Sequence, residues 1–249
     1  MLKKLIIIIL FILGILHGEN INIAVAANVS YAMDDIKKEF KKLYPNVNLK
    51  VTLGSSGKLT AQIKNGAPYQ LFMSANMKYP KVLYNEKIAI TKPVVYAQGL
   101  LAILSNNQKN FQKGIEIIDS NLIKKIAIAN PKTAPYGKAS VEAIKNAHLY
   151  KKSQSKFIYA ESISQTVSYT VIAADIGFIA KSSLYSSKMS KYKEHINWEE
   201  VDSNLYNPIK QGIVILKNGQ NNSDVKAFYD FILSSKAQKI FKDYGYLVQ

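Results

Sequence analysis

The sequence contains no cysteine and no arginine. Without cysteine, the chain can form neither a disulfide nor a lipid-modified cysteine anchor, and it has no thiol nucleophile. Without arginine, all 33 basic residues are lysines. Lysine contacts phosphate as a point charge, whereas bidentate reading of guanine favours arginine. The net charge of +16 predicts a basic surface that steers anions. It would also suit a nucleic-acid-binding protein, but the lack of arginine and the dispersed lysines argue against that function.

Catalytic signatures are also missing. The three histidines lie far apart in the chain, at His17, His148 and His195, and no HExxH, GxSxG or GxGxxG motif is present. The stretch GSSGKLT at 54–60 is not a phosphate-binding P-loop, because two residues instead of four separate its glycines and Leu59 follows the lysine. These absences predict a protein that is not an enzyme, with no cofactor and no direct metal-cation ligands.

The first 18 residues have the pattern of a secretory signal peptide. Lys3 and Lys4 precede an apolar run over 5–16, and a polar stretch follows at 17–19. The run is shorter than the roughly 20 residues that span a bilayer. We therefore expect residues 1–18 to be removed and the mature protein to be soluble in the periplasm, with an uncleaved anchor as the alternative.

Strand-like and helix-like segments alternate along the rest of the chain. The alternation predicts α/β layers with largely parallel sheets. Strands are predicted at 21–25, 47–53, 71–73, 94–104, 124–129, 157–160, 175–180 and 209–216, and helices at about 33–43, from 74–76, at about 138–150, and over the stripes 225–232 and 237–244.

Four of the strand ends carry uncharged hydrogen-bond donors, at 28–30, 55–56, 133–137 and 162–165. A helix that follows such a turn presents backbone N–H groups without intrahelical acceptors and the positive end of its dipole. The carboxyl ends of parallel strands meet at one crevice. The pattern predicts a small-anion site made of neutral donors, and ordinary helix caps are the alternative for each turn.

Five segments carry a recognisable pattern, in this order along the chain: AVAANVSYAMDDIKKEF, GSSGKLTAQIKNGAPYQLFMSAN, ANPKTAPYGKASVEAI, ESISQTV with ADIGFIA, and VKAFYDFILSSKAQKIFKDYGY. Together they resemble the molybdate-binding subunits of molybdate/tungstate ABC importers, which are type II periplasmic substrate-binding proteins.

This resemblance implies a two-lobed α/β fold with a hinge, in which each lobe is a mixed, mainly parallel sheet flanked by helices. We expect lobe 1 to comprise residues 19–98 and 205–249, and lobe 2 residues 99–204. The implied partners are a small oxyanion and a membrane permease with its ATPase. The protein is expected to be a monomer.

The resemblance also implies the ligand contacts. Asn28 occupies a position that is usually serine, Ser56 matches a serine that binds through its hydroxyl and N–H, and Tyr136 and Ile163 would donate their backbone N–H groups. These four residues would bind the oxygen atoms of the oxyanion, and none of them would be a direct ligand of the metal.

Three positions depart from the family pattern. The amide of Asn28 reaches farther than a hydroxyl, and Ala180 stands where many members have a tyrosine donor. Gln70 replaces a usual aspartate and is expected to have a structural role. These changes leave the choice between molybdate and tungstate open. The alternatives are a sulfate, phosphate or small organic anion binder on the same scaffold, a basic surface-binding exported protein, and a hydrolase.

Overall fold

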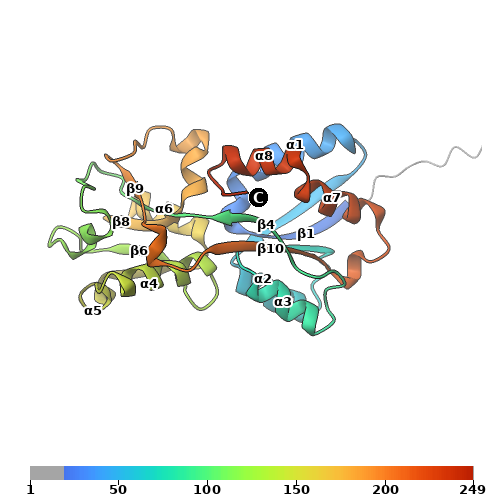
Figure 1. Cartoon of the computed structure of the whole chain (residues 1–249), viewed down its shortest axis with the longest axis horizontal. Coiled ribbons are helices and arrows are strands. Elements are labelled where there is room, and N and C mark those ends of the chain that lie inside the picture. The colour runs from blue at the N-terminus through green and yellow to red at the C-terminus, as the bar shows by residue number, and fades with distance from the viewer. Residues whose placement is uncertain (1–19, 249) are drawn as a thin grey trace, which may run out of the picture.

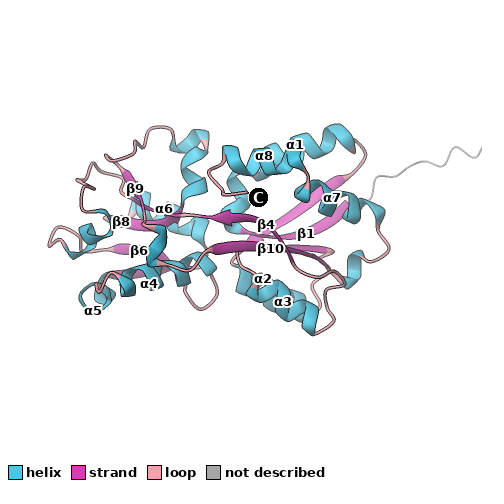
Figure 2. Ribbon diagram, viewed as in Figure 1, coloured by secondary structure: helices cyan, strands magenta, loops and turns pink. Residues whose placement is uncertain are grey.

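The computed structural model describes residues 20–248, and the predicted signal peptide at 1–18 lies outside them. The described residues form two five-stranded sheets that lie in opposite halves of an elongated molecule (Figures 1 and 2). In spatial order, the first sheet contains β2 (Asn48–Gly54), β1 (Asn20–Ala26), β3 (Leu71–Ser74), β10 (Ile209–Ile215) and β4 (Val94–Gly99). The second contains β7 (Phe157–Ala160), β6 (Ile126–Ala129), β8 (Ile176–Ala180), β5 (Leu101–Leu104) and β9 (Trp198–Glu200).

Both sheets are mixed, as expected, but their antiparallel share is larger than the sequence pattern predicts. The pairs β1–β2, β1–β3, β6–β7 and β6–β8 are parallel. The pairs β3–β10, β4–β10, β5–β8 and β5–β9 are antiparallel. The antiparallel strands are those next to the two passages of the chain between the halves, at Leu100 and over 201–208. The run 94–104 is accordingly two strands in different sheets.

Helices cover both faces of the first sheet (Figure 1). Ile21, Ile23 and Val25 of β1 pack in one apolar cluster with residues of α1, α7 and α8, whereas Ala24 packs with residues of α2 and α3 on the opposite face. This strand is therefore buried on both faces, as is typical of a parallel sheet between helices. The helices are α1 (Met33–Leu43), α2 (Ser56–Lys64), α3 (Lys78–Asn85), α7 (Ser223–Leu233) and α8 (Ser235–Asp243).

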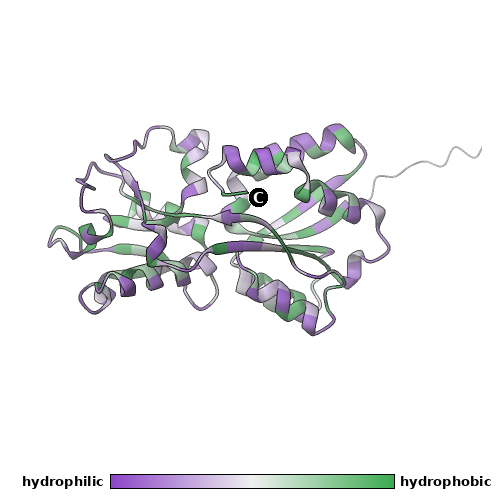
Figure 3. Cartoon of the chain, in the orientation of Figure 1, coloured by the Kyte–Doolittle hydropathy of each residue, from purple (hydrophilic) through white to green (hydrophobic). Residues whose placement is uncertain are grey.

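The second sheet is enclosed in the same way. Leu101 and Ile103 pack with residues of α4, and Ala102 and Leu104 pack on the other face with Val167 of α6. Apolar residues are concentrated along the strands of both sheets (Figure 3). The remaining elements are α4 (Pro135–Asn146), α5 (Tyr150–Ser153), α6 (Ile163–Ile172) and the 3₁₀ segments η1 (Ala27–Tyr31), η2 (Gly114–Asp119), η3 (Gln154–Lys156), η4 (Lys181–Tyr185), η5 (Ser187–Met189), η6 (Ser203–Leu205) and η7 (Lys217–Gly219).

Several helix boundaries differ from the predicted ones. The helix expected at about 138–150 begins at Pro135, since proline suits the first helical position, where its missing N–H costs no hydrogen bond. This helix ends at Asn146, and His148 lies beyond it, with φ 60°. The helix expected from 74–76 begins at Lys78. Leu43, the last residue of the helix expected at 33–43, is 54% exposed.

Within residues 20–248 no helix has the length and hydropathy needed to cross a membrane.

Candidate functional site

The four predicted site residues line one small pocket between the two halves of the molecule. Each stands at the start of a helix: Ser56 and Ile163 are the first residues of α2 and α6, and Asn28 and Tyr136 are the second residues of η1 and α4. The first half contributes Asn28 and Ser56, and the second half contributes Tyr136 and Ile163. The structure therefore brings all four together. The full lining is Ala26, Ala27, Asn28, Gly54, Ser55, Ser56, Ala75, Ala134, Pro135, Tyr136 and Ile163.

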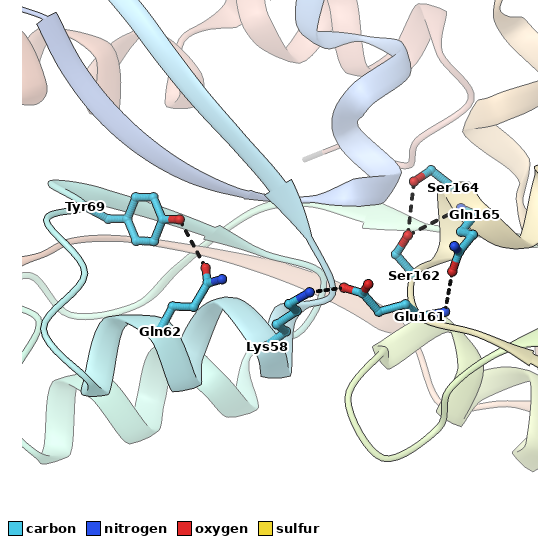
Figure 4. A network of polar contacts seen from close by, with 7 residues as sticks. All are labelled: Lys58, Gln62, Tyr69, Glu161, Ser162, Ser164 and Gln165. Atoms are coloured by element: carbon cyan, nitrogen blue, oxygen red, sulfur yellow. Dashed lines mark hydrogen bonds and ion pairs between the residues drawn. The ribbon is translucent and has the colours of Figure 1, made fainter.

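The pocket faces backbone donors at the starts of α2, α4 and α6. The first N–H groups of a helix have no intrahelical acceptor. Within the described residues, α2 and α4 have no side-chain cap. At α6, Ser162 caps the helix: Ser162 Oγ accepts from the Gln165 N–H at 3.3 Å. Gln165 Oε1 accepts in turn from the N–H of Glu161, the residue before the cap, at 2.7 Å (Figure 4). None of these capping bonds uses the backbone N–H of Ser56, Tyr136 or Ile163. These three donors are therefore suited to binding an anion.

Ser56 offers a side-chain donor as well. The residue is fully buried, and its Oγ accepts a hydrogen bond from the Ala75 N–H at 2.9 Å. Because a hydroxyl has one donor and two acceptor sites, this bond leaves the hydroxyl hydrogen of Ser56 for a ligand.

Unlike Ser56, Tyr136 and Ile163 have no side-chain group available to a ligand. Burial raises the pKa of the Tyr136 hydroxyl well above its usual value, so this ring stays neutral. Its hydroxyl oxygen accepts from Gln211 Nε2 at 3.3 Å. The Ile163 side chain packs in the apolar core of the second half. For both residues the backbone N–H is the group that remains for a ligand.

Asn28 is held by a buried polar network. Its Nδ2 donates to Gln211 Oε1 at 2.8 Å and to the Tyr246 hydroxyl at 2.9 Å. Tyr246 donates in turn to the backbone oxygen of Asn28 at 2.9 Å, and Tyr96 donates to Gln211 Oε1 at 2.8 Å. Among the described residues, Asn28 Oδ1 is buried without a hydrogen-bond partner. Asn28 Nδ2, the donor expected to contact a ligand, is thus engaged in this network. The group of the side chain that remains free is the acceptor Oδ1.

Gln211 and Tyr246 are not among the site residues predicted from the sequence. The signal available for Gln211 was a polar residue inside the apolar strand run 209–216. Gln211 stands where the pairing of β10 with β4 is irregular, and such bulges redirect side chains. Its contact with Asn28 joins residues 183 positions apart, and that of Tyr246 joins residues 218 positions apart.

The pocket is neutral and small. No lysine, histidine, aspartate or glutamate is among the described residues that line it, and the described part of the chain has no group of three or more His, Cys, Asp or Glu that could hold a metal ion. About 10 Å³ is open to the centre of a water-sized sphere, roughly what one water molecule needs. The pocket therefore has no room for a sugar or a nucleotide.

Contacts around the pocket join the two halves. The Gly57 N–H donates to the Thr133 oxygen at 2.9 Å. Lys58, at the start of α2, forms an ion pair with Glu161, before α6, at 2.8 Å (Figure 4). Ser182 Oγ donates to the Asn28 oxygen at 3.2 Å. With these contacts in place, the structure shows the halves closed over the pocket.

Comparisons with known proteins agree with this geometry. The profile of the bacterial extracellular solute-binding proteins matches residues 21–247. The molybdate-binding protein ModA of Azotobacter vinelandii is 34% identical over 94% of this chain and 92% of its own length. ModA of Rhodobacter capsulatus is 32% identical over 91% of this chain and 87% of its own length.

A solved structure, the periplasmic molybdate-binding protein of Azotobacter vinelandii, superposes with a TM-score of 0.84 at 30% identity and covers 92% of this chain and 99% of that one. Its fold is the type II periplasmic binding protein fold of two mixed sheets flanked by helices. The chain therefore belongs to the bacterial extracellular solute-binding proteins, the family that includes these molybdate-binding relatives.

Proposed function

We propose that this chain is the substrate-binding component of an ABC importer and binds one molybdate or tungstate ion between its two lobes. The convergence of helix starts from both halves on one neutral pocket carries the proposal. Oriented N–H and hydroxyl donors can replace the hydration of a dianion without a counter-ion. The names of the 34% and 32% identical relatives support this ligand.

Residues 19–98 and 205–249 form lobe 1 in this proposal, and residues 99–204 form lobe 2. The two passages between the sheets, at Leu100 and over 201–208, act as the hinge. Since each lobe supplies part of the donor set, the ligand has its complete shell when the lobes are closed, and it therefore stabilises that state.

Asn28 takes part by turning its amide. A rotation of 180° exchanges Oδ1 for Nδ2 at the pocket and removes an acceptor that would repel an anion. The network can follow this rotation, because Gln211 has an amide donor and the Tyr246 hydroxyl can donate as well as accept. The bound anion thus selects the amide orientation in which Asn28 donates to it.

The closed complex would then deliver its ion to a membrane permease with its ATPase. In this proposal the protein acts as an exported monomer in the periplasm, and it binds its solute without transforming it. Sulfate is rejected because a smaller anion leaves donors of the closed pocket unpaired, and an unpaired buried donor is costly.

The primary test is thermal unfolding with molybdate, tungstate, sulfate and phosphate at matched ionic strength. A ligand that binds the native state stabilises it by about 4 kcal/mol at a thousand-fold excess over its dissociation constant. We expect a large rise in the midpoint with molybdate, tungstate or both. A rise with sulfate or phosphate alone would favour the alternative oxyanion binder, and no rise with any of the four would contradict the proposal.

The site assignment is tested by calorimetry of Ser56→Ala and Asn28→Ala with molybdate. Each variant loses a donor to a charged ligand, worth about 1.5–3 kcal/mol, so we expect binding to weaken by roughly 10- to 100-fold. Ser105→Ala is the matched control, since its buried hydroxyl donates to the Asp175 oxygen at 2.9 Å away from the pocket. Unchanged affinity in both site variants would show that the site is misassigned.

A further inference from the structure

Ser55 is a second buried serine in the pocket lining, next to the expected ligand contact Ser56 in the turn 55–56. It precedes α2, has an exposed fraction of 4%, and its Oγ is buried without a hydrogen-bond partner among the described residues. Few buried polar groups in native proteins lack a partner, and each such group has a cost that something must offset.

The side chain of Ser55 does not cap its helix, although its position is that of an N-cap. The main chain does what an N-cap requires: the backbone is extended, and the Ser55 oxygen accepts from the Leu59 N–H at 3.0 Å. Ser162 and Ser234 hold the same position in α6 and α8, and their side chains accept from the N–H groups of Gln165 and Ala237. Ser55 therefore has its hydroxyl free for another use.

Other hydroxyls near the pocket are already engaged. Ser182 donates to the Asn28 oxygen, and Thr60 donates to the Ser56 oxygen at 2.7 Å. Ala180 has no side-chain donor. Ser55 is thus the lining hydroxyl whose hydrogen-bonding capacity is unused.

We infer that Ser55 is a further ligand-binding residue, whose hydroxyl donates to an oxygen of the bound oxyanion. This inference rests on the proposed function. Ser55 then supplies a side-chain donor beyond those of Ser56 and Asn28, and the bound oxyanion gives its hydroxyl an acceptor. The bond to a charged oxygen is worth roughly a 10- to 100-fold change in affinity.

The test compares Ser55→Ala and Ser55→Gly with Ser234→Ala, by calorimetry with molybdate and by thermal unfolding without it. Glycine is tolerated at an N-cap nearly as well as serine, so Ser55→Gly removes the hydroxyl and keeps the helix start. We expect both Ser55 variants to bind molybdate roughly 10- to 100-fold more weakly and to keep or raise the ligand-free unfolding midpoint. Ser234→Ala, which loses a true cap, should unfold earlier and bind as the unmodified protein does.

Two outcomes would overturn the inference. One is unmodified molybdate affinity in Ser55→Ala while Ser56→Ala binds weakly, which would leave the proposed function standing. The other is a ligand-free midpoint lowered as much as in Ser234→Ala without any loss of affinity, which would make Ser55 a helix cap. If the unmodified protein does not bind molybdate, the proposed function fails instead.

Discussion

At the scale of single residues, the polar network behind the pocket is built from neutral groups. Tyr96, Tyr136 and Tyr246 are buried, and burial raises the pKa of each hydroxyl. Their hydroxyls and the amides of Asn28 and Gln211 hold one another by hydrogen bonds. The site can therefore present hydrogen-bond donors over the physiological pH range without charging any of these groups.

Replacing Tyr246 by phenylalanine should change stability in a pH-dependent way. Burial raises the pKa of Tyr246 from 10.0 to about 12, with smaller opposing effects of hydrogen bonds to Ser182, Asn28 and Gln211. A raised pKa in the folded state contributes stability that is complete below pH 10.0 and is lost as the pH rises toward about 12. Tyr246→Phe should cost about 1 kcal/mol at neutral pH and should lose less stability than the unmodified protein across that alkaline range.

Urea unfolding at neutral and alkaline pH measures both effects of this substitution. An alkaline loss of stability as steep as that of the unmodified protein would show that Tyr246 does not titrate in this way.

At the scale of elements, the start of α2 makes a close backbone contact across the pocket. The Gly57 N–H reaches the Thr133 oxygen in the loop before α4. A Cβ at position 57 would lie 2.7 Å from the Tyr79 hydroxyl oxygen and 2.9 Å from Thr133 Cα. Here glycine is required by a close approach between the two lobes, and not by an unusual backbone angle.

Gly57→Ala should therefore weaken molybdate binding by at least tenfold and leave the ligand-free unfolding midpoint nearly unchanged. The clash exists when the lobes are closed, so it reduces the population that can complete the site. Gly66→Ala is the control: it meets no atom within 4 Å but has φ 87°, so it should lower stability by about 1–2 kcal/mol and bind normally. Calorimetry and thermal unfolding of both variants separate the two effects, and unaltered binding by Gly57→Ala would argue against closure at this contact.

At the scale of the whole molecule, the charge of +16 surrounds a neutral pocket. Lys78, Lys132 and Lys138 line a hollow that shares Ala134 and Pro135 with the pocket lining. A basic approach to a neutral site raises the encounter rate of an anion without adding a counter-ion to the bound state. The exposed Lys58–Glu161 ion pair contributes little to stability, about 0–1 kcal/mol.

Raising the ionic strength should accordingly slow molybdate association and leave dissociation nearly unchanged. Between about 0.01 M and about 1 M salt the screening length falls from roughly 30 Å to roughly 3 Å. Stopped-flow fluorescence gives both rate constants. Binding that disappears at high salt would instead favour the basic surface-binding protein, whose contacts are lysines exposed to solvent.

The order of strands and turns could be read from the sequence because it depends on local patterns. Apolar strand runs, small polar turns and amphipathic stripes are short-range signals, and they placed Asn28, Ser56, Tyr136 and Ile163 at strand ends. The structure also bears out the structural role expected of Gln70, whose Oε1 accepts from the Asn22 N–H at 2.9 Å. The start of α4 was missed, since the proline that looked like part of a rigid loop is its first residue.

The sequence by itself determined the fold class, the absence of cysteine and arginine chemistry, and which turns meet at the pocket. The tertiary structure alone decided that the Asn28 amide is held by Gln211 and Tyr246, that Gly57 must lack a side chain, and that Ser55 has a free hydroxyl. Each of these depends on contacts, or on the lack of one, between segments that come together after folding. Local sequence preferences cannot predict such contacts, because the contacts form only when the two lobes close around a shared site.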